Sequence, residues 1–219
     1  MKNPQRSIES YKEGASKVNE AIDSLPDEPR NVIKKEADDL KAKYPANVLK
    51  LKVGDQAPDF TLKNAVGTTV GLYQLLKTNR VVLTFYRGTW CPYCNLQLTK
   101  YQEVIFKLKS MGSLMVAISP QTPDESLNMK EKNKLQFEVL SDPHNKVAGD
   151  YTTIIKKSSE FAGTISSMGK QFVEHYHDDS NEVPIPAVFI IDQDGSILFA
   201  QSEGGDYRDR VETDDVIDA

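Results

Sequence analysis

The stretch from Val81 to Leu98 constrains this chain most, because it places the only two cysteines at the junction of a predicted strand and a predicted helix. Its sequence is VVLTFYRGTWCPYCNLQL. The apolar, β-branched and aromatic run from Val81 to Tyr86 is typical of a strand that is buried on both faces. Gly88 allows the chain to turn, and Pro92 suits the first turn of a helix, where a missing N–H group costs nothing. Apolar residues then continue at helical spacing, so we expect a strand, a turn and a helix in that order.

Cys91 falls at the N-terminus of this predicted helix, and Cys94 follows one turn later on the same face. Unpaired backbone N–H groups and the helix dipole stabilise an anion there, so we expect the Cys91 thiolate to form at a lower pH than in a free cysteine. The thiolate is the nucleophilic form of cysteine. We therefore expect Cys91 to be the attacking thiol and the more deeply placed Cys94 to be the resolving thiol of a redox-active disulfide.

Structural roles compete with redox chemistry for this cysteine pair. A disulfide that closes so short a loop removes little entropy from the unfolded chain, and two buried core thiols would need no chemistry. A zinc site needs two further ligands at finger-like spacing, whereas the histidines are only His144, His175 and His177. We expect the last two to be solvated residues of a polar loop. Redox chemistry is therefore the favoured interpretation, and no metal is predicted.

Several motifs follow one another along the chain. They are GDQAPDFTL at 54–62, WCPYC at 90–94, AISP at 117–120, FEVLSD at 137–142 and PAVFIID at 186–192. Together they resemble the peroxiredoxin-like AhpC/TSA family (alkyl hydroperoxide reductase and thiol-specific antioxidant) of the thioredoxin superfamily, over residues 53–217. The resemblance implies an α/β, thioredoxin-like fold with a central mixed β-sheet flanked by helices. It also implies a thiol-dependent antioxidant oxidoreductase.

The resemblance leaves two candidate activities. Peroxiredoxins carry a Pro-x-x-x-Thr-x-x-Cys motif that orients the peroxide, but this chain has Thr84 at the proline position and Gly88 at the threonine position. The shorter loop resembles that of thioredoxin or glutaredoxin, which favours a protein disulfide or glutathione disulfide reductase. The longer resemblance over the whole body favours a peroxidase, which is our first interpretation. A redox-responsive binding module is the non-enzymatic alternative.

The same resemblance suggests residues that support the cysteines. Pro186 takes the position of the proline before the strand that faces the cysteines, so we expect a cis Ile185–Pro186 bond that leaves the Ile185 backbone free to bind a thiol substrate. An ordinary edge-strand proline is the structural alternative.

From the residues themselves, we expect Arg87 to stabilise the attacking thiolate. We expect Trp90 and Tyr93 to form an apolar collar around the sulfur, although Trp90 would serve equally well as a core residue.

The composition of the chain argues against some classes of partner and location. The formal net charge of −5 argues against nucleic acid or an anionic membrane surface as a partner. No apolar run approaches the ~18 residues that a transmembrane helix needs, and the first residues contain no apolar signal core. We therefore expect a cytoplasmic protein that has no cofactor, acts on a peroxide or disulfide substrate and is reduced by thioredoxin or glutathione.

We predict an N-terminal helical extension over residues 1–49 and a thioredoxin-like domain over residues 50–219. The extension is expected to contain two amphipathic helices that are broken near Pro26. Such an extension either packs on its own chain, which we favour, or pairs two subunits in a homodimer. Farther on, strands alternate with helices in the manner of βαβ units. Residues 151–183 are the least regular and are expected to lie over or beside the site.

Overall fold

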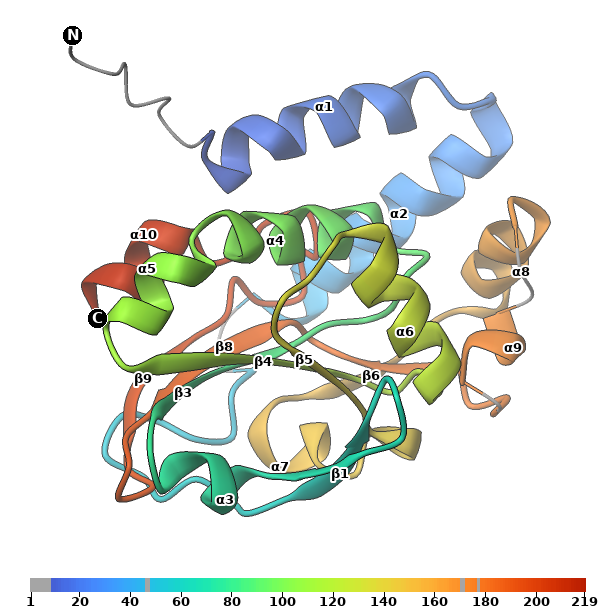
Figure 1. Ribbon diagram of the computed structural model, residues 1–219. Helices are drawn as coiled ribbons and strands as arrows, with labels where there is room; N and C mark the ends of the chain where they lie inside the picture. Colours follow the sequence, from blue (N-terminus) through green and yellow to red (C-terminus); the bar gives the residue numbers. More distant parts are fainter. Residues whose placement is uncertain (1–8, 46–47, 170–171, 177) are drawn as a thin grey trace, which may run out of the picture.

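The computed structural model of the protein describes residues 9–45, 48–169, 172–176 and 178–219 (Figure 1). The strands of the main sheet are β1 (Thr61–Asn64), β2 (Thr69–Gly71), β3 (Arg80–Phe85), β4 (Ser113–Ser119), β5 (Glu138–Ser141), β8 (Ala187–Ile191) and β9 (Ile197–Gln201). They form a seven-stranded sheet in the order β2-β1-β5-β4-β3-β8-β9. Parallel pairing joins β3, β4 and β5, whereas β1, β2, β8 and β9 pair antiparallel with their neighbours. The predicted α/β class with a central mixed sheet is confirmed.

Helices cover both faces of this sheet (Figure 1). One face carries α4 (Pro92–Glu103), α5 (Ile105–Ser110), α6 (Pro123–Lys132) and α10 (Thr213–Asp218). The other face carries α3 (Leu72–Leu76) and α7 (Ala148–Tyr151), which follows a short 3-10 turn at Pro143–Asn145. The central strand β3 alternates between the two hydrophobic clusters, with Val81, Leu83 and Phe85 in one and Val82 in the other. This alternation confirms a strand buried on both faces.

The apolar residues that follow Cys94 continue at helical spacing to Leu108, but α4 ends before that point. It ends at Glu103, because Val104 has a ψ of 4° and its N–H group bonds to the Tyr101 carbonyl in a tighter turn. The chain then continues as α5. The N-terminal end of α4, which carries the cysteines, begins at Pro92 as predicted.

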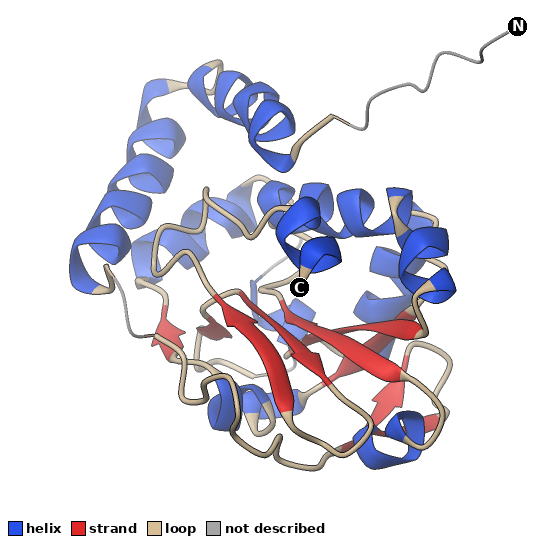
Figure 2. Cartoon of the chain, turned by 90° about the vertical axis from the view of Figure 1, so that its left-hand side faces the viewer, coloured by secondary structure: helices blue, strands red, loops and turns tan. Residues whose placement is uncertain are grey.

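The predicted pair of N-terminal helices is present as α1 (Tyr11–Asp23) and α2 (Asp27–Lys43). They form an angled arm along the outside of the core (Figure 2). α1 packs on α4 at Gly14, where an added Cβ would lie 2.7 Å from Leu96 Cδ1. α2 packs against α8 (Ser159–Ser167). The extension therefore packs on its own chain, which is the arrangement we favoured from the sequence.

Residues 151–183 contain more regular structure than expected. β6 (Ile154–Lys156) and β7 (Glu182–Pro184) form a small two-stranded sheet, and α8 and α9 (Phe172–Tyr176) lie between them in the chain. The prediction of a solvated His175 is wrong. His175 belongs to α9 and is buried. Its Nδ1 lies 2.9 Å from Glu125 Oε2 on α6, which gives the buried imidazole the polar partner that it requires. His177 lies outside the described residues.

Among the described residues, no helix is both long enough and apolar enough to cross a membrane.

Candidate active site

The two cysteines lie where the loop after β3 leads into α4. Cys91 is the N-cap residue of α4, and its Sγ accepts a hydrogen bond from the Cys94 N–H group at 3.2 Å. Both thiols are free, and both residues have an exposed fraction of 0%. Burial therefore does not rank them, although we expected Cys94 to lie deeper. The loop before Cys91 turns at Gly88. A Cβ at this position would lie only 2.8 Å from Trp90 Nε1, so the turn requires glycine.

Arg87 is the closest cation to Cys91. Its Nη2 donates a hydrogen bond to Cys91 Sγ at 2.9 Å, and the residue is buried. The guanidinium carbon lies 3.7 Å from the centroid of the Tyr207 ring and 4.9 Å from that of the Trp90 ring. Among the described residues, Arg87 Nε and Nη1 have no hydrogen-bond partner. Two aromatic faces therefore stabilise a buried cation that still has free donors next to the sulfur.

A second buried arginine approaches the other sulfur from the C-terminal segment. Arg210 Nη2 lies 3.7 Å from Cys94 Sγ, and Arg210 Nη1 donates to the carbonyls of Tyr207 and Asp209. Neither Arg210 nor Tyr207 was singled out from the sequence. Both follow α4 by a long stretch of chain, so no local spacing links them to the cysteines. Only the fold brings them together.

The pKa values of the two thiols move in opposite directions. Burial, followed by the hydrogen bond with Cys94, raises the pKa of Cys91 well above its ordinary value. Burial also opposes ionisation of Cys94, but its hydrogen bond with Cys91 and the charges of Arg210 and Arg87 prevail and hold the pKa of Cys94 well below its ordinary value. The two sulfurs share a proton, so these pKa values belong to the pair. The expectation that the Cys91 thiolate forms at a lower pH than a free cysteine is therefore wrong for Cys91 itself, because burial outweighs the charge of Arg87, and the lowered pKa is that of Cys94 within the coupled pair.

A third buried cation, Lys157, was also missed from the sequence. Its side chain has an exposed fraction of 0%, and Nζ lies 3.4 Å from Glu36 Oε1 on α2. Nζ also lies 4.5 Å from the Phe161 ring centroid and 4.7 Å from that of Tyr207. Burial, followed by repulsion from Arg87, lowers the pKa of Lys157 to about 7. Most lysines are exposed, and nothing in the sequence distinguishes a buried lysine from these.

The two aromatic residues that were predicted to form a collar around the sulfur differ in burial. Trp90 is half-buried, and its Nε1 donates to Tyr176 Oη at 2.5 Å, which in turn donates to the Arg87 carbonyl at 2.9 Å. Tyr93 is buried and donates from Oη to Asn19 Oδ1 at 2.6 Å. The intervening Pro92 is exposed. Trp90 thus fixes the loop, and Tyr93 joins the site to α1.

The expectation for Ile185 and Pro186 is wrong. The peptide bond between them is trans. The Ile185 N–H group donates to the Thr153 carbonyl at 2.8 Å, and the Ile185 carbonyl accepts from Thr152 Oγ1 at 3.0 Å. The segment next to β6 therefore occupies both backbone groups that we expected to be free for a substrate. Pro186 is buried directly before Ala187, the first residue of β8.

With this geometry in place, comparison with known proteins identifies the family. The AhpC/TSA family profile matches residues 53–200. The chain belongs to the AhpC/TSA family. A Mycobacterium tuberculosis protein that is named provisionally as a peroxiredoxin is 27% identical over 152 residues, which cover 69% of this chain and 85% of that protein.

Solved structures confirm the thioredoxin-like fold of this AhpC/TSA protein. Peroxidoxin BcpB from Mycobacterium tuberculosis has a TM-score of 0.60 at 21% identity, covering 77% of this chain and 95% of that chain. A peroxiredoxin-like protein from Aquifex aeolicus has a TM-score of 0.58 at 19% identity, covering 77% and 85%. Family membership also confirms the predicted general function, a thiol-dependent oxidoreductase of the peroxiredoxin kind that works with a peroxide and a thiol reductant.

Proposed function

We propose that Cys91 and Cys94 form the redox pair of a thiol peroxidase, with Cys91 as the attacking thiol and Cys94 as the resolving thiol. The observation that carries this assignment is the pair of donors on Cys91 Sγ. Arg87 Nη2 donates at 2.9 Å and the Cys94 N–H group donates at 3.2 Å. Both donors favour negative charge on this sulfur and fix its position, so they offset part of the burial that raises the pKa of Cys91.

The reaction proceeds in two displacements. The Cys91 thiolate attacks one peroxide oxygen and the O–O bond breaks, so that the leaving alkoxide or hydroxide takes up a proton and Cys91 becomes a sulfenic acid. The Cys94 thiolate then attacks the Cys91 sulfur, which expels hydroxide that leaves as water with a second proton. The product is a Cys91–Cys94 disulfide, and a thiol reductant returns both sulfurs to the thiol state.

Arg87 also offers hydrogen-bond donors to a peroxide that is bound next to the Cys91 sulfur. Its Nε and Nη1 have no hydrogen-bond partner among the described residues, yet they belong to the same guanidinium that contacts Cys91. Donors aimed at the leaving oxygen stabilise the negative charge that develops as the O–O bond breaks. Arg87 would thus compensate for the missing threonine at the position of Gly88.

A second candidate activity, disulfide reduction, is favoured by that missing threonine. Gly88 offers no hydroxyl to a peroxide, and the Cys-Pro-Tyr-Cys loop brings the two sulfurs into mutual contact. A pair of this kind exchanges readily with a substrate disulfide. The peroxidase stays our first proposal, because the family match extends over residues 53–200.

Stopped-flow oxidation of the pre-reduced protein by hydrogen peroxide tests the choice. Trp90 is the only tryptophan and adjoins Cys91, so its fluorescence reports the reaction. We expect a second-order rate constant far above that of a free thiolate. A rate no faster than a free thiolate, together with fast reaction with disulfides, would establish the reductase. Redox-dependent partner binding without turnover in either assay would indicate the binding module.

The Cys94→Ser variant tests the order of the two sulfurs. We expect a single turnover that leaves Cys91 as a sulfenic acid or a mixed disulfide, identified by mass spectrometry. Cys91→Ser should give no turnover. Sustained turnover of Cys94→Ser with thioredoxin as reductant would contradict the resolving role of Cys94.

We also propose a cytoplasmic protein in which residues 1–49 extend a thioredoxin-like domain at residues 50–219. Thioredoxin and glutathione are the proposed reductants. A homodimer stays a prediction from the sequence, and sedimentation would distinguish it from a monomer of 24.5 kDa.

A further inference from the structure

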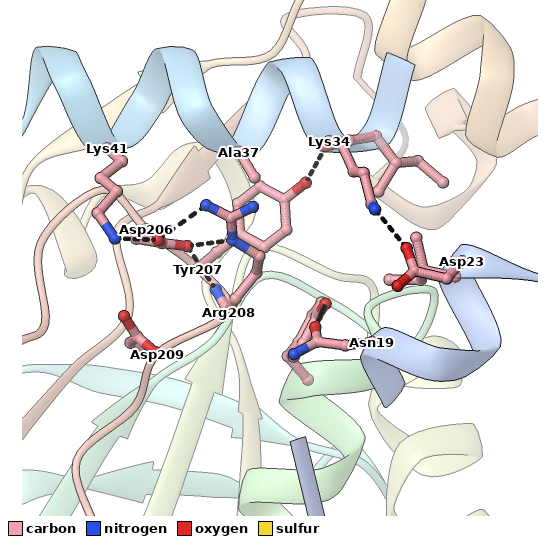
Figure 3. Close-up of a pocket in the computed structure, with 12 residues that line it drawn as sticks. Asn19, Asp23, Lys34, Ala37, Lys41, Asp206, Tyr207, Arg208 and Asp209 are labelled. Atoms are coloured by element: carbon pink, nitrogen blue, oxygen red, sulfur yellow. Dashed lines mark hydrogen bonds and ion pairs between the residues drawn. The ribbon is translucent and has the colours of Figure 1, made fainter. Parts of the chain in front are cut away.

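Two buried cations pack on the ring of Tyr207. The guanidinium carbon of Arg87 lies 3.7 Å from the ring centroid, and Nζ of Lys157 lies 4.7 Å from it. Both residues have an exposed fraction of 1%. Figure 3 shows the hydroxyl of this tyrosine directed at α2, where it donates a hydrogen bond to the Ile33 carbonyl. The ring is therefore fixed in position, and it keeps two like charges close to each other.

The charged groups that act most strongly on Lys157 come from three different parts of the chain. Glu36 on α2 attracts it, with Oε1 at 3.4 Å from Nζ. Arg87 in the loop after β3 repels it, and Cys91 at the start of α4 attracts it when the cysteine pair carries a thiolate. Two uncharged aromatic rings also contact Nζ. The positive charge of Lys157 is therefore offset by one carboxylate and by the thiolate of the redox pair.

Of the three buried cations that the structure describes around the cysteines, only Lys157 can lose its proton near neutral pH. The guanidinium groups of Arg87 and Arg210 stay protonated in proteins. A buried ammonium is deprotonated far more easily, and burial followed by repulsion from Arg87 lowers the pKa of Lys157 to about 7. A modest change in the charge nearby therefore decides whether Lys157 is protonated.

Closing the disulfide makes such a change. The reduced pair shares a proton and carries one negative charge, whereas a disulfide carries none. At the effective dielectric constant of a protein, a charge about 10 Å away shifts a pKa by about one unit. Loss of the thiolate removes an attraction from Lys157 but leaves the repulsion from Arg87 in place. Formation of the disulfide therefore favours the neutral amine.

We propose that Lys157 is a redox-linked proton site, which holds a proton while the cysteine pair carries a thiolate and releases it when the Cys91–Cys94 disulfide forms. Glu36 gives the released proton a route to solvent, because its carboxylate lies 3.4 Å from Nζ and its side chain is 12% exposed. The inference rests on the proposed redox pair and deepens it, since it names the residue that compensates for the charge lost on oxidation.

The atoms and charges of the peroxidase reaction then balance without a proton from solvent. A thiolate, a thiol, the Lys157 ammonium and a peroxide become a disulfide, a neutral amine, an alcohol or water, and a second water. Two electrons pass from the sulfurs to the peroxide oxygens as the O–O bond breaks. The thiol supplies one of the two protons that these oxygens take up, and release from Lys157 matches the other. When a thiol reductant restores the thiolate, Lys157 regains its proton.

Carbon NMR of protein with lysine isotope-labelled at Cε tests the proposal, because the shift of this carbon reports whether the amine is protonated. The Lys157 signal is the one that is missing from Lys157→Met and present in Lys156→Met, the variant of its exposed neighbour. We expect the signal to titrate near pH 7 in the reduced protein and about one pH unit lower after oxidation by diamide. A midpoint that is unchanged or higher in the oxidised protein would overturn the proposal.

Proton uptake gives a second readout. Diamide takes two electrons and two protons, of which the cysteine thiol supplies one. A pH indicator in weakly buffered solution measures the other, and ultraviolet absorbance counts the thiolates that are lost. Near pH 6.5 the wild type and Lys156→Met should take up about half a proton per thiolate, and Lys157→Met about one. Lys157→Arg should also take up about one, since arginine keeps the charge but cannot release it. Equal uptake by the wild type and Lys157→Met would contradict the proposal.

Neither measurement requires peroxidase activity, so the two proposals can fail separately. A protein that reduced no peroxide but lowered the Lys157 midpoint on oxidation by diamide would refute the proposed function and retain the proton site. Rapid reduction of peroxide with a Lys157 midpoint that does not respond to oxidation would retain the redox pair and refute the proton site.

Discussion

The guanidinium carbon of Arg87 lies 3.7 Å from the centroid of the Tyr207 ring. This contact joins the loop after β3 to the C-terminal segment and leaves Arg87 Nη2 bonded to Cys91 Sγ at 2.9 Å. An aromatic face replaces the oxygen acceptors that a buried guanidinium would otherwise need. The charge that faces the attacking sulfur is therefore positioned by a residue from the far end of the chain.

Replacing Arg87 tests this arrangement directly. A hydrogen bond to a charged group is worth about 1.5–3 kcal/mol, so Arg87→Met should raise the pKa of the first ionisation of the cysteine pair by about 1–2 units. Ultraviolet absorbance of the thiolate measures that pKa. The rate of oxidation by peroxide at neutral pH should fall by at least about tenfold.

Arg80→Met is the matched control for this substitution. Arg80 lies at the other end of β3 in a half-exposed ion pair with Asp192, and such surface pairs contribute little. An unchanged thiolate pKa in Arg87→Met, or an equal change in Arg80→Met, would show that Arg87 does not set the charge of the pair.

The sequence predicted the parts of this site that are close together in the chain. The strand, the turn at Gly88 and the helix that begins at Pro92 follow from local patterns, and these patterns also placed Arg87 near Cys91. Arg210 could not be predicted, because its contact with Cys94 exists only once the C-terminal segment has folded over α4. Long-range contacts of this kind leave no periodicity in the sequence.

The trans bond before Pro186 shows a different limit. The resemblance predicted a free Ile185 backbone, but the chain next to β6 supplies a carbonyl from Thr153 and a hydroxyl from Thr152 that occupy it. The short strands β6 and β7 have little apolar alternation of their own, so the sequence predicted neither. Local insertions can therefore change a site whose family is recognised correctly.

Lys157 makes stability depend on pH. Burial, followed by repulsion from Arg87, lowers its pKa from 10.5 in the unfolded chain to about 7 in the folded protein, whereas Glu36 and Cys91 oppose this change. Between these pKa values the unfolded state binds more protons, so the free energy of unfolding rises with pH across this window. Below about pH 7 both states are protonated, and the full cost of burying the charge is present.

Urea unfolding of the wild type and of Lys157→Met measures this effect. The wild type should gain about 2 kcal/mol relative to Lys157→Met between about pH 7 and about pH 9. The exposed neighbour Lys156 provides the control, and Lys156→Met should follow the wild type. Parallel pH profiles for the wild type and Lys157→Met would mean that Lys157 keeps an ordinary pKa.

Two tyrosine hydroxyls attach the N-terminal arm over the cysteines. Tyr93 Oη donates to Asn19 Oδ1 at 2.6 Å, and Tyr207 Oη donates to the Ile33 carbonyl at 2.9 Å. Tyr93→Phe/Tyr207→Phe should lose about 1–3 kcal/mol of stability and make opening of the arm correspondingly more frequent. Because both cysteines are buried, alkylation of the native protein by iodoacetamide should become at least about fivefold faster.

Tyr73→Phe controls for the loss of a hydroxyl. Tyr73 Oη donates to the Ala57 carbonyl at 3.0 Å, on the face of the sheet opposite the cysteines. This variant should be destabilised without faster alkylation. Alkylation that follows global stability in all the variants would mean that the cysteines react only from the unfolded state.

Glu212 is expected to hold the start of the N-terminal arm. Its carboxylate accepts hydrogen bonds from the Tyr11 N–H group at 2.8 Å and from the Lys12 N–H group at 3.0 Å. These are unpaired donors of the first turn of α1, where a negative charge also interacts favourably with the helix dipole. Glu212→Ala should cost about 1–2 kcal/mol of unfolding free energy and accelerate amide exchange in α1 more than in the central strands. Glu203→Ala removes an equal charge from an exposed loop position after β9 and should change neither. Uniform acceleration of amide exchange through α1 and β3 in Glu212→Ala would contradict this role. It would mean that the N-terminal arm and the core open as one unit. The C-terminal segment would then not be a separate attachment for the helices that cover Cys91.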